Sequence, residues 1–211
     1  MSLVNLPYFL EAAIMAVVLL FSVIVHEVAH GYVALLNGDP TARMMGRITL
    51  NPVPHIDPIG TIFLPLLLLI TQSGIIFGWA RPVPVNSLNF RNYRWGEITV
   101  SAAGPLSNLA LAVIFAYLLR LGVGNLGLMK MAYYGVLINI FLALFNLIPI
   151  PPLDGSHLLA SFLPPKLARL YAYLEPFGFI LLLLLLYSGL LGVIIMPLAR
   201  TIFSFLTGGL F

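Results

Sequence analysis

The 211-residue sequence contains no cysteine, and only 8% of its residues are charged. The missing cysteines exclude disulfide bonds and zinc sites built from thiolates. The scarcity of charge excludes an ordinary soluble domain, in which about a quarter of the residues are charged. Internal repeats and nucleic-acid-binding motifs are also missing from the sequence. What remains is a chain that is 61% hydrophobic, a composition typical of membrane proteins.

Long apolar runs occupy most of the chain. A helix that crosses the bilayer needs about 20 mainly apolar residues. Stretches of suitable length lie near 8–36, 58–76, 96–121, 128–148, 170–188 and 190–208. The sequence therefore predicts an all-α integral membrane protein of about six transmembrane helices, in a single domain over residues 1–211. The first run lacks a basic leader and a small-residue cleavage site, so we expect it to be retained rather than removed as a signal peptide.

Two connections have the composition of short strands or extended loops at the membrane surface. Residues 41–57 mix β-forming residues with two Asn/Pro turns, and residues 80–90 alternate Pro with Val. The fourth predicted helix ends in NLIPIPPLDG, whose prolines remove backbone donors. Non-helical backbone at membrane depth is tolerated only where protein buries it or where it lines a water-filled cavity. We therefore expect a pocket beside this proline-rich segment.

One short motif carries the chemistry. His26-Glu27-Val28-Ala29-His30 is an HExxH sequence, and on a helix its spacing places both imidazoles on one face with Glu27 beside them. The two histidines are therefore predicted zinc ligands, and Glu27 is the predicted general base that takes a proton from the zinc-bound water. Ionisable side chains within membrane helices are costly and mark functional sites. The motif predicts peptide hydrolysis.

A catalytic zinc usually takes three protein ligands, so one more residue must complete the site. Asp154 follows the proline-broken segment and is favoured by its spacing, while His55 and His157 are the alternatives. His157 would otherwise begin a helix or orient a ligand. Two rival functions are a zinc or ion transporter and a scaffold that binds transmembrane helices without cleaving them. Neither rival requires Glu27 in addition to the metal ligands.

The order of several motifs resembles that of a known family. The motifs are HEVAH at 26–30, GRITLNPVPHIDPIGTIFLP at 46–65, FGWARPVPVN at 77–86, AAGPLSN at 102–108 and NLIPIPPLDG at 146–155. Together they resemble the site-2 protease family of intramembrane zinc metalloproteases, peptidase family M50, in its small prokaryotic form without PDZ or CBS domains. The resemblance runs nearly end to end. Its specificity comes from the pairing of HExxH with NxxPxxxxDG in an all-membrane chain.

The resemblance implies a function and a zinc site. Asp154 would complete the site with His26 and His30, holding one zinc per chain, and Glu27 would be the catalytic base. The catalytic core would comprise the spans at about 8–36, 96–121 and 128–157. The substrates would be transmembrane proteins, cleaved within or near their membrane segments, in the lipid bilayer of a prokaryotic cell.

The resemblance also points to further site residues. Asn146 would bind substrate or stabilise the reacting carbonyl, with helix capping as the alternative. His55 matches a recurring histidine of the family, for which substrate contact, metal binding and loop packing are comparable interpretations. Asn108 would pack between helices or line their polar face. A helical substrate must unwind before cleavage, and the extended segments 41–50 or 81–90 could pair with it as added strands.

Overall fold

The computed structural model of the protein describes residues 7–71, 80–122 and 124–209, and all regular structure in these ranges is helical. The elements are α1 (Tyr8–Leu36), α2 (Thr41–Met44), the 3-10 helix η1 (Val53–His55), the π-helical turn η2 (Pro58–Phe63), α3 (Leu64–Ile70), the 3-10 helix η3 (Ser87–Asn89), α4 (Tyr93–Leu121), α5 (Leu126–Asn146), α6 (Asp154–Phe162), α7 (Pro165–Ala172), α8 (Glu175–Tyr187) and α9 (Leu190–Thr207). The all-α class expected from the sequence is confirmed.

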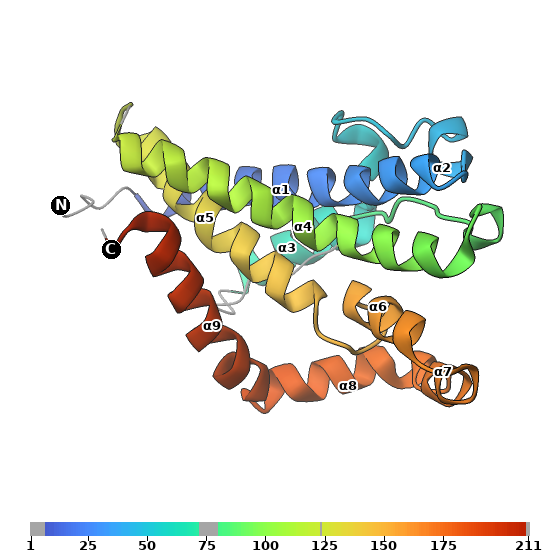
Figure 1. Ribbon diagram of the computed structural model, residues 1–211. Coiled ribbons are helices and arrows are strands. Elements are labelled where there is room, and N and C mark those ends of the chain that lie inside the picture. The colour runs from blue at the N-terminus through green and yellow to red at the C-terminus, as the bar shows by residue number, and fades with distance from the viewer. Residues whose placement is uncertain (1–6, 72–79, 123, 210–211) are drawn as a thin grey trace.

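Three long helices form the centre of the molecule. Helices α1, α4 and α5 pack against one another, and α9 contacts both α4 and α5 (Figure 1). The packing is close because the facing positions of α4 and α5 are small, with Ala112, Ala116 and Ala132 in the buried cluster that Phe203 of α9 completes. Small side chains allow helix backbones to approach closely, which is how helices associate in a membrane without a hydrophobic driving force.

Within the described residues, four helices are long and apolar enough to cross a membrane: α1, α4, α5 and α9. Helices α7 and α8 make a fifth crossing if they form one span bent by 66°. The bend has a local cause, because Pro176 in the first turn of α8 cannot continue the helix from α7. The span expected over 58–76 begins as η2 and α3, and its end lies outside the described residues. The chain is a multi-pass membrane protein.

The two polar connections are loops in the described part of the chain, which contains no β-strand. Residues 41–57 fold into α2, a bend and η1, while residues 81–86 run extended and belong to no strand ladder. The backbone N–H of Arg81 donates to the carbonyl oxygen of His55 at 2.9 Å. Pro82 and Pro84 lack the N–H groups that a strand ladder needs. The guanidinium of Arg47 instead donates to the carbonyl oxygens of Arg81 and Pro82, at 2.6 and 3.1 Å. The extended-loop alternative therefore holds for this segment.

A buried carboxylate anchors the extended segment to the end of α1. Asp39 accepts hydrogen bonds from the backbone and hydroxyl of Thr41 at 3.1 and 2.5 Å, from the Asn89 amide at 2.8 Å and from the backbone N–H of Asn86 at 2.7 Å. Burial alone would raise the pKa of Asp39, but these hydrogen bonds outweigh it and hold the pKa below its usual value. The ionised carboxylate therefore stabilises this corner of the fold.

We expect Asp39→Asn to lower the melting temperature in detergent at neutral pH. One carboxylate oxygen becomes an NH₂ group facing other donors, and leaving buried donors unpaired costs about 1–3 kcal/mol. The pKa of Asp39 is lower in the folded protein than in the unfolded chain. The carboxylate therefore adds its full stabilisation above about pH 4, the pKa in the unfolded chain, and loses it as the pH falls through the pKa in the folded protein.

Thermal unfolding of the two proteins should therefore differ at pH 7 and converge below about pH 4. Glu175→Gln, at an exposed position, is the matched control and should melt like the wild type at every pH. A difference between wild type and Asp39→Asn that did not change with pH would contradict the role of the ionised carboxylate.

Candidate metal centre and active site

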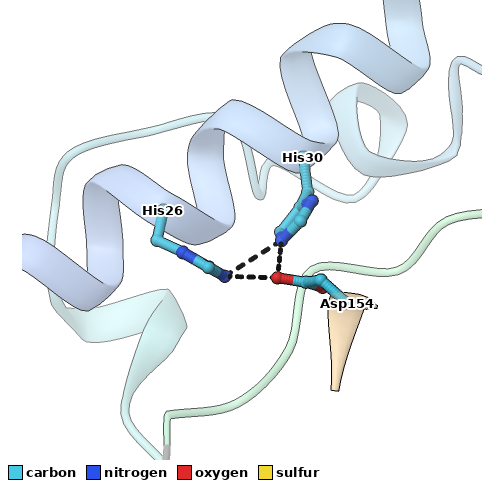
Figure 2. Close-up of side chains that lie close together, drawn as sticks. All are labelled: His26, His30 and Asp154. Atoms are coloured by element: carbon cyan, nitrogen blue, oxygen red, sulfur yellow. Dashed lines mark hydrogen bonds and ion pairs between the residues drawn. The ribbon is translucent and has the colours of Figure 1, made fainter. Parts of the chain in front are cut away.

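Two successive turns of α1 and the first residue of α6 converge on one point. Figure 2 shows the imidazoles of His26 and His30 facing the carboxylate of Asp154. The two Nε2 atoms lie 3.0 Å apart, and Oδ2 of Asp154 lies 3.1 Å from Nε2 of His26 and 3.3 Å from Nε2 of His30. Both histidines precede the end of α1 by six to ten residues, which puts them about 9–15 Å inside that end of the helix. The site is therefore inside the helical bundle.

Hydrogen bonds on the far side of each ring define what the near side offers. Nδ1 of His30 lies 2.7 Å from the carbonyl oxygen of Val100, which can only accept, so this Nδ1 carries the proton. Nδ1 of His26 lies 2.6 Å from the side-chain oxygen of Asn108, which is also an acceptor. In its neutral form, each ring then presents a bare Nε2 to the other and to Asp154.

Three lone-pair atoms in mutual contact need a cation between them. Oδ2 of Asp154 is buried and has no hydrogen-bond partner among the described residues. Two imidazoles and a carboxylate are the nitrogen and oxygen ligands that zinc takes in catalytic sites. A tetrahedral zinc with bonds of about 2.0–2.1 Å separates its ligand atoms by about 3.3 Å, close to the distances observed here. The residues therefore fit a zinc ion with a fourth position left open.

Glu27 lies in the same cavity, which has a volume of about 440 Å³. One of its carboxylate oxygens, Oε2, accepts a hydrogen bond of 2.7 Å from the backbone N–H of Val83. Val83 stands between Pro82 and Pro84, so its N–H is the only backbone donor of that tripeptide. The extended segment thus fixes one oxygen of the carboxylate and leaves the other available to a water molecule.

Arg47 adds positive charge on the same side of the site. Its burial and the neighbouring Arg81 lower the pKa of Arg47, while the charge of Glu27 works in the opposite direction. An arginine starts so far above neutrality that it stays protonated. Arg47 therefore both fixes the extended segment and offsets the charge of Glu27.

Close backbone packing determines where Asp154 lies. A Cβ atom on Gly155 would lie 2.3 Å from the carbonyl oxygen of Leu147, so only glycine lets α6 begin this close to the end of α5. The hydroxyl of Tyr171 in α7 donates to the carbonyl of Pro149 at 2.7 Å. The proline-rich segment that ends α5 is thereby held against α7, and the first residue of α6 points at α1.

The other residues predicted from the sequence fall in different places. Asn146, the last residue of α5, and His157, one turn after Asp154, both line the cavity. The side-chain amide of Asn146 donates to the carbonyl of Leu142 in its own helix at 2.9 Å. His55 does not line the cavity: it is fully buried in η1, with Nε2 2.8 Å from the carbonyl oxygen of Thr49. Of its interpretations, loop packing agrees best with this position.

Sequence reasoning missed two features of the site in α4. Gly104 faces the imidazoles, where a Cβ atom would lie 2.4 Å from Nε2 of His30 and 2.5 Å from Nε2 of His26. Asn108, expected mainly to pack, accepts the hydrogen bond from His26. The signal was present in the small, polar AAGPLSN stretch, but only the helix register shows which of its residues face α1.

Two buried histidines and a partly buried aspartate, beside a glutamate inside a helical membrane bundle, define a class of membrane-embedded zinc hydrolases. The sequence pattern of peptidase family M50 matches residues 14–124 and 122–185. The chain therefore belongs to peptidase family M50 and is a zinc metallopeptidase.

Individual relatives agree with this assignment. YwhC of Bacillus subtilis is 40% identical over 192 residues, covering 87% of this chain and 84% of the relative. Rip2 of Mycolicibacterium smegmatis is 31% identical over 181 residues, covering 80% of this chain and 64% of the relative. Both are named as zinc metalloproteases by inference. The zinc metalloprotease MJ0392 of Methanocaldococcus jannaschii is 25% identical over 199 residues, covering 92% of this chain and 48% of the relative. No solved structure matches the chain.

We expect Gly104→Ala to abolish zinc binding while the protein still folds. The added methyl group would occupy the space of the imidazole nitrogens, and the rings would have to leave the geometry that holds the metal. Zinc affinity should fall by at least about 100-fold, the upper end of the effect of disturbing a ligand's support.

Gly192→Ala is the matched control, because Gly192 is also helical and a Cβ there meets nothing within 4 Å. Metal analysis and a competition titration with a chelator measure both variants. Full zinc occupancy in Gly104→Ala would show that the metal does not lie between these two rings.

Proposed function

We propose that the protein is an intramembrane protease that hydrolyses peptide bonds within or near transmembrane segments of membrane-protein substrates. In this proposal His26, His30 and Asp154 bind a single zinc ion, and Glu27 is the general base. The observation that carries it is the meeting of two imidazole nitrogens and a carboxylate oxygen inside a bundle of apolar helices, with Glu27 in the same cavity. The bacterial and archaeal relatives support a prokaryotic cell membrane as the location.

The catalytic unit would be the part of the single domain formed by α1, α4, α5 and α6. Zinc, when bound, lowers the pKa of its water to about 7 and polarises the scissile carbonyl. The free oxygen of Glu27 accepts the proton of that water and passes it to the leaving nitrogen. Val83 holds the other oxygen in place, so the base does not have to be oriented at the moment of reaction.

The extended segment 81–86 would also receive the substrate. Its residues Pro82, Val83 and Val85 line the cavity, and the backbone N–H of Val85 has no hydrogen-bond partner within the described ranges. A peptide unwound from its helix loses its own hydrogen bonds and gains from pairing with such an edge. We propose that this segment, rather than residues 41–50, which fold mainly into α2 and bends, is the pairing edge.

Replacing the base tests the reaction. Glu27→Gln should keep the zinc and bind substrate, yet lose cleavage, because the amide keeps the shape of the carboxylate but cannot take a proton. Zinc content and cleavage of a transmembrane substrate are measured on the same preparation. His26→Ala and Asp154→Ala, which should lose the metal, are the controls.

The outcome separates the proposed protease from the rival functions. A transporter would move zinc equally well with Gln at position 27, and a scaffold would show no cleavage in the wild type. Residual turnover above about one per cent of the wild-type rate would mean that another group serves as the base, since acid–base catalysis typically contributes 10²–10⁴-fold.

Removing one backbone donor tests the pairing edge. Val85→Pro should lower cleavage strongly without loss of zinc, because proline keeps the extended backbone and deletes the N–H. Val85→Ala keeps the N–H and is the control for the lost side chain. Equal activity of the Pro and Ala variants would contradict pairing at Val85.

Asn146 is the proposed donor to the developing oxyanion. Loss of one such donor costs about 10²–10³ in kcat, so Asn146→Ala should show that loss with zinc content and KM close to wild type. Asn146→Asp should be at least as slow, because a carboxylate cannot donate. A capping role predicts the opposite order, since Asp caps as well as Asn. An active Asn146→Asp enzyme would therefore refute the oxyanion role.

A further inference from the structure

A chain of buried amides runs from His26 through two other helices. The amide nitrogen of Asn108 in α4 donates to the side-chain oxygen of Asn139 in α5 at 2.8 Å. The amide nitrogen of Asn139 donates in turn to the hydroxyl of Ser22 and to the backbone carbonyl of Gly135, both at 2.8 Å. Asn108, Asn139 and Ser22 are fully buried. The proposed reaction leaves Asn139 and Ser22 without a role.

The chain has a direction, because it ends on a group that can only accept. The carbonyl of Gly135 cannot donate, so the atom of Asn139 facing it must be the nitrogen. The oxygen of Asn139 therefore faces Asn108, which must present its own nitrogen there. The remaining atom of Asn108, its oxygen, then faces Nδ1 of His26. Nδ1 must carry the proton, and Nε2 is left bare.

The two histidines differ in how this state is enforced. His30 meets the backbone carbonyl of Val100, an acceptor that the helix fixes. His26 meets only a side-chain amide, which presents either an acceptor or a donor depending on its rotation. An Asn108 turned by half a rotation would favour the proton on Nε2 of His26, where it would block metal binding. Two acceptors hold one rotation: the backbone carbonyl of Ser22 accepts from the amide nitrogen of Asn108 at 3.3 Å, and the side-chain oxygen of Asn139 accepts from it at 2.8 Å.

We propose that Asn139, the nearer of the two acceptors, is the positioning residue that makes this rotation of Asn108 dominant. Asn139 fixes the amide of Asn108, and Asn108 fixes the tautomer and ring orientation of His26. The inference rests on the proposed role of His26 as a zinc ligand. A backbone carbonyl of α5 thereby controls the metal-binding nitrogen of α1, about one helix diameter away.

The test is a double-mutant cycle read as zinc affinity, measured by competition with a chelator in detergent. Asn139→Leu, which keeps a similar volume, should weaken zinc binding about tenfold, and Asn108→Ala should weaken it 10–100-fold, the range for groups that support a ligand. In the Asn108→Ala background, Asn139→Leu should cause no further loss, because its effect passes through Asn108. An equal loss in both backgrounds, or no loss in either, would overturn the proposal.

Ser22→Ala is the matched control. It removes a hydrogen bond from the same buried residue, but the Gly135 carbonyl still orients Asn139. Zinc affinity should therefore match the wild type, and a loss as large as that of Asn139→Leu would show that general packing, not orientation, is responsible. His26→Ala tests the zinc-ligand role of His26 separately from the positioning role of Asn139. Retention of zinc in that variant would reject His26 as a ligand.

A measurement on the metal-free wild type needs no variant to fold. The ¹⁵N chemical shifts of the His26 ring should report a protonated Nδ1 and a bare Nε2, as expected for the Nδ1–H tautomer. A protonated Nε2 would overturn the proposal. In metal-free Asn139→Leu, the signal should change to a mixture of the two tautomers, and an unchanged spectrum would count against Asn139 as the selecting residue.

Discussion

The structure depends on the need to satisfy polar groups inside a bundle of apolar helices. Unpaired polar groups are costly there, so each polar atom around the site has one permitted role. The carbonyl oxygen of Val100 and the side-chain oxygen of Asn108 accept hydrogen bonds from Nδ1 of His30 and Nδ1 of His26. What they leave over is a set of bare lone pairs beside Asp154, which only a cation stabilises. The metal centre is thus a consequence of hydrogen bonding on the outer side of each ligand.

The same constraint explains why the site needs small residues. Gly104 brings α4 against the imidazoles, and Gly155 brings α6 under the end of α5. Both glycines are helical, and neither has the positive φ for which turns often require glycine. Their role is to admit a neighbouring backbone or ring, which places Asn108 within reach of His26. A larger residue would widen the helix spacing, and the hydrogen bonds that define the ligands would lengthen with it.

Much of this arrangement could be predicted from the sequence, for identifiable reasons. The spacing of His26 and His30 fixes their common face once α1 is a helix, and composition makes it a membrane helix. The pocket beside NLIPIPP followed from the absence of backbone donors. Asn139 lies outside every recognised motif, as a single polar residue in an apolar helix, so only the contact between α4 and α5 shows its partner. The burial of His55 in η1, away from the cavity, could not be predicted for a similar reason: a motif position gives no burial.

Proline solves the problem of placing irregular backbone at such a depth, and the two proline segments do so in complementary ways. In Pro82-Val83-Pro84 the two prolines remove donors, so that the single remaining N–H is committed to Glu27. In the segment that ends α5, prolines interrupt the helix. The hydroxyl of Tyr171, in α7, donates a hydrogen bond to the carbonyl oxygen of Pro149 in this segment. One segment therefore positions the base and the other positions Asp154, from opposite sides of the cavity. In both segments the prolines reduce the number of backbone N–H groups that need a partner beside the cavity.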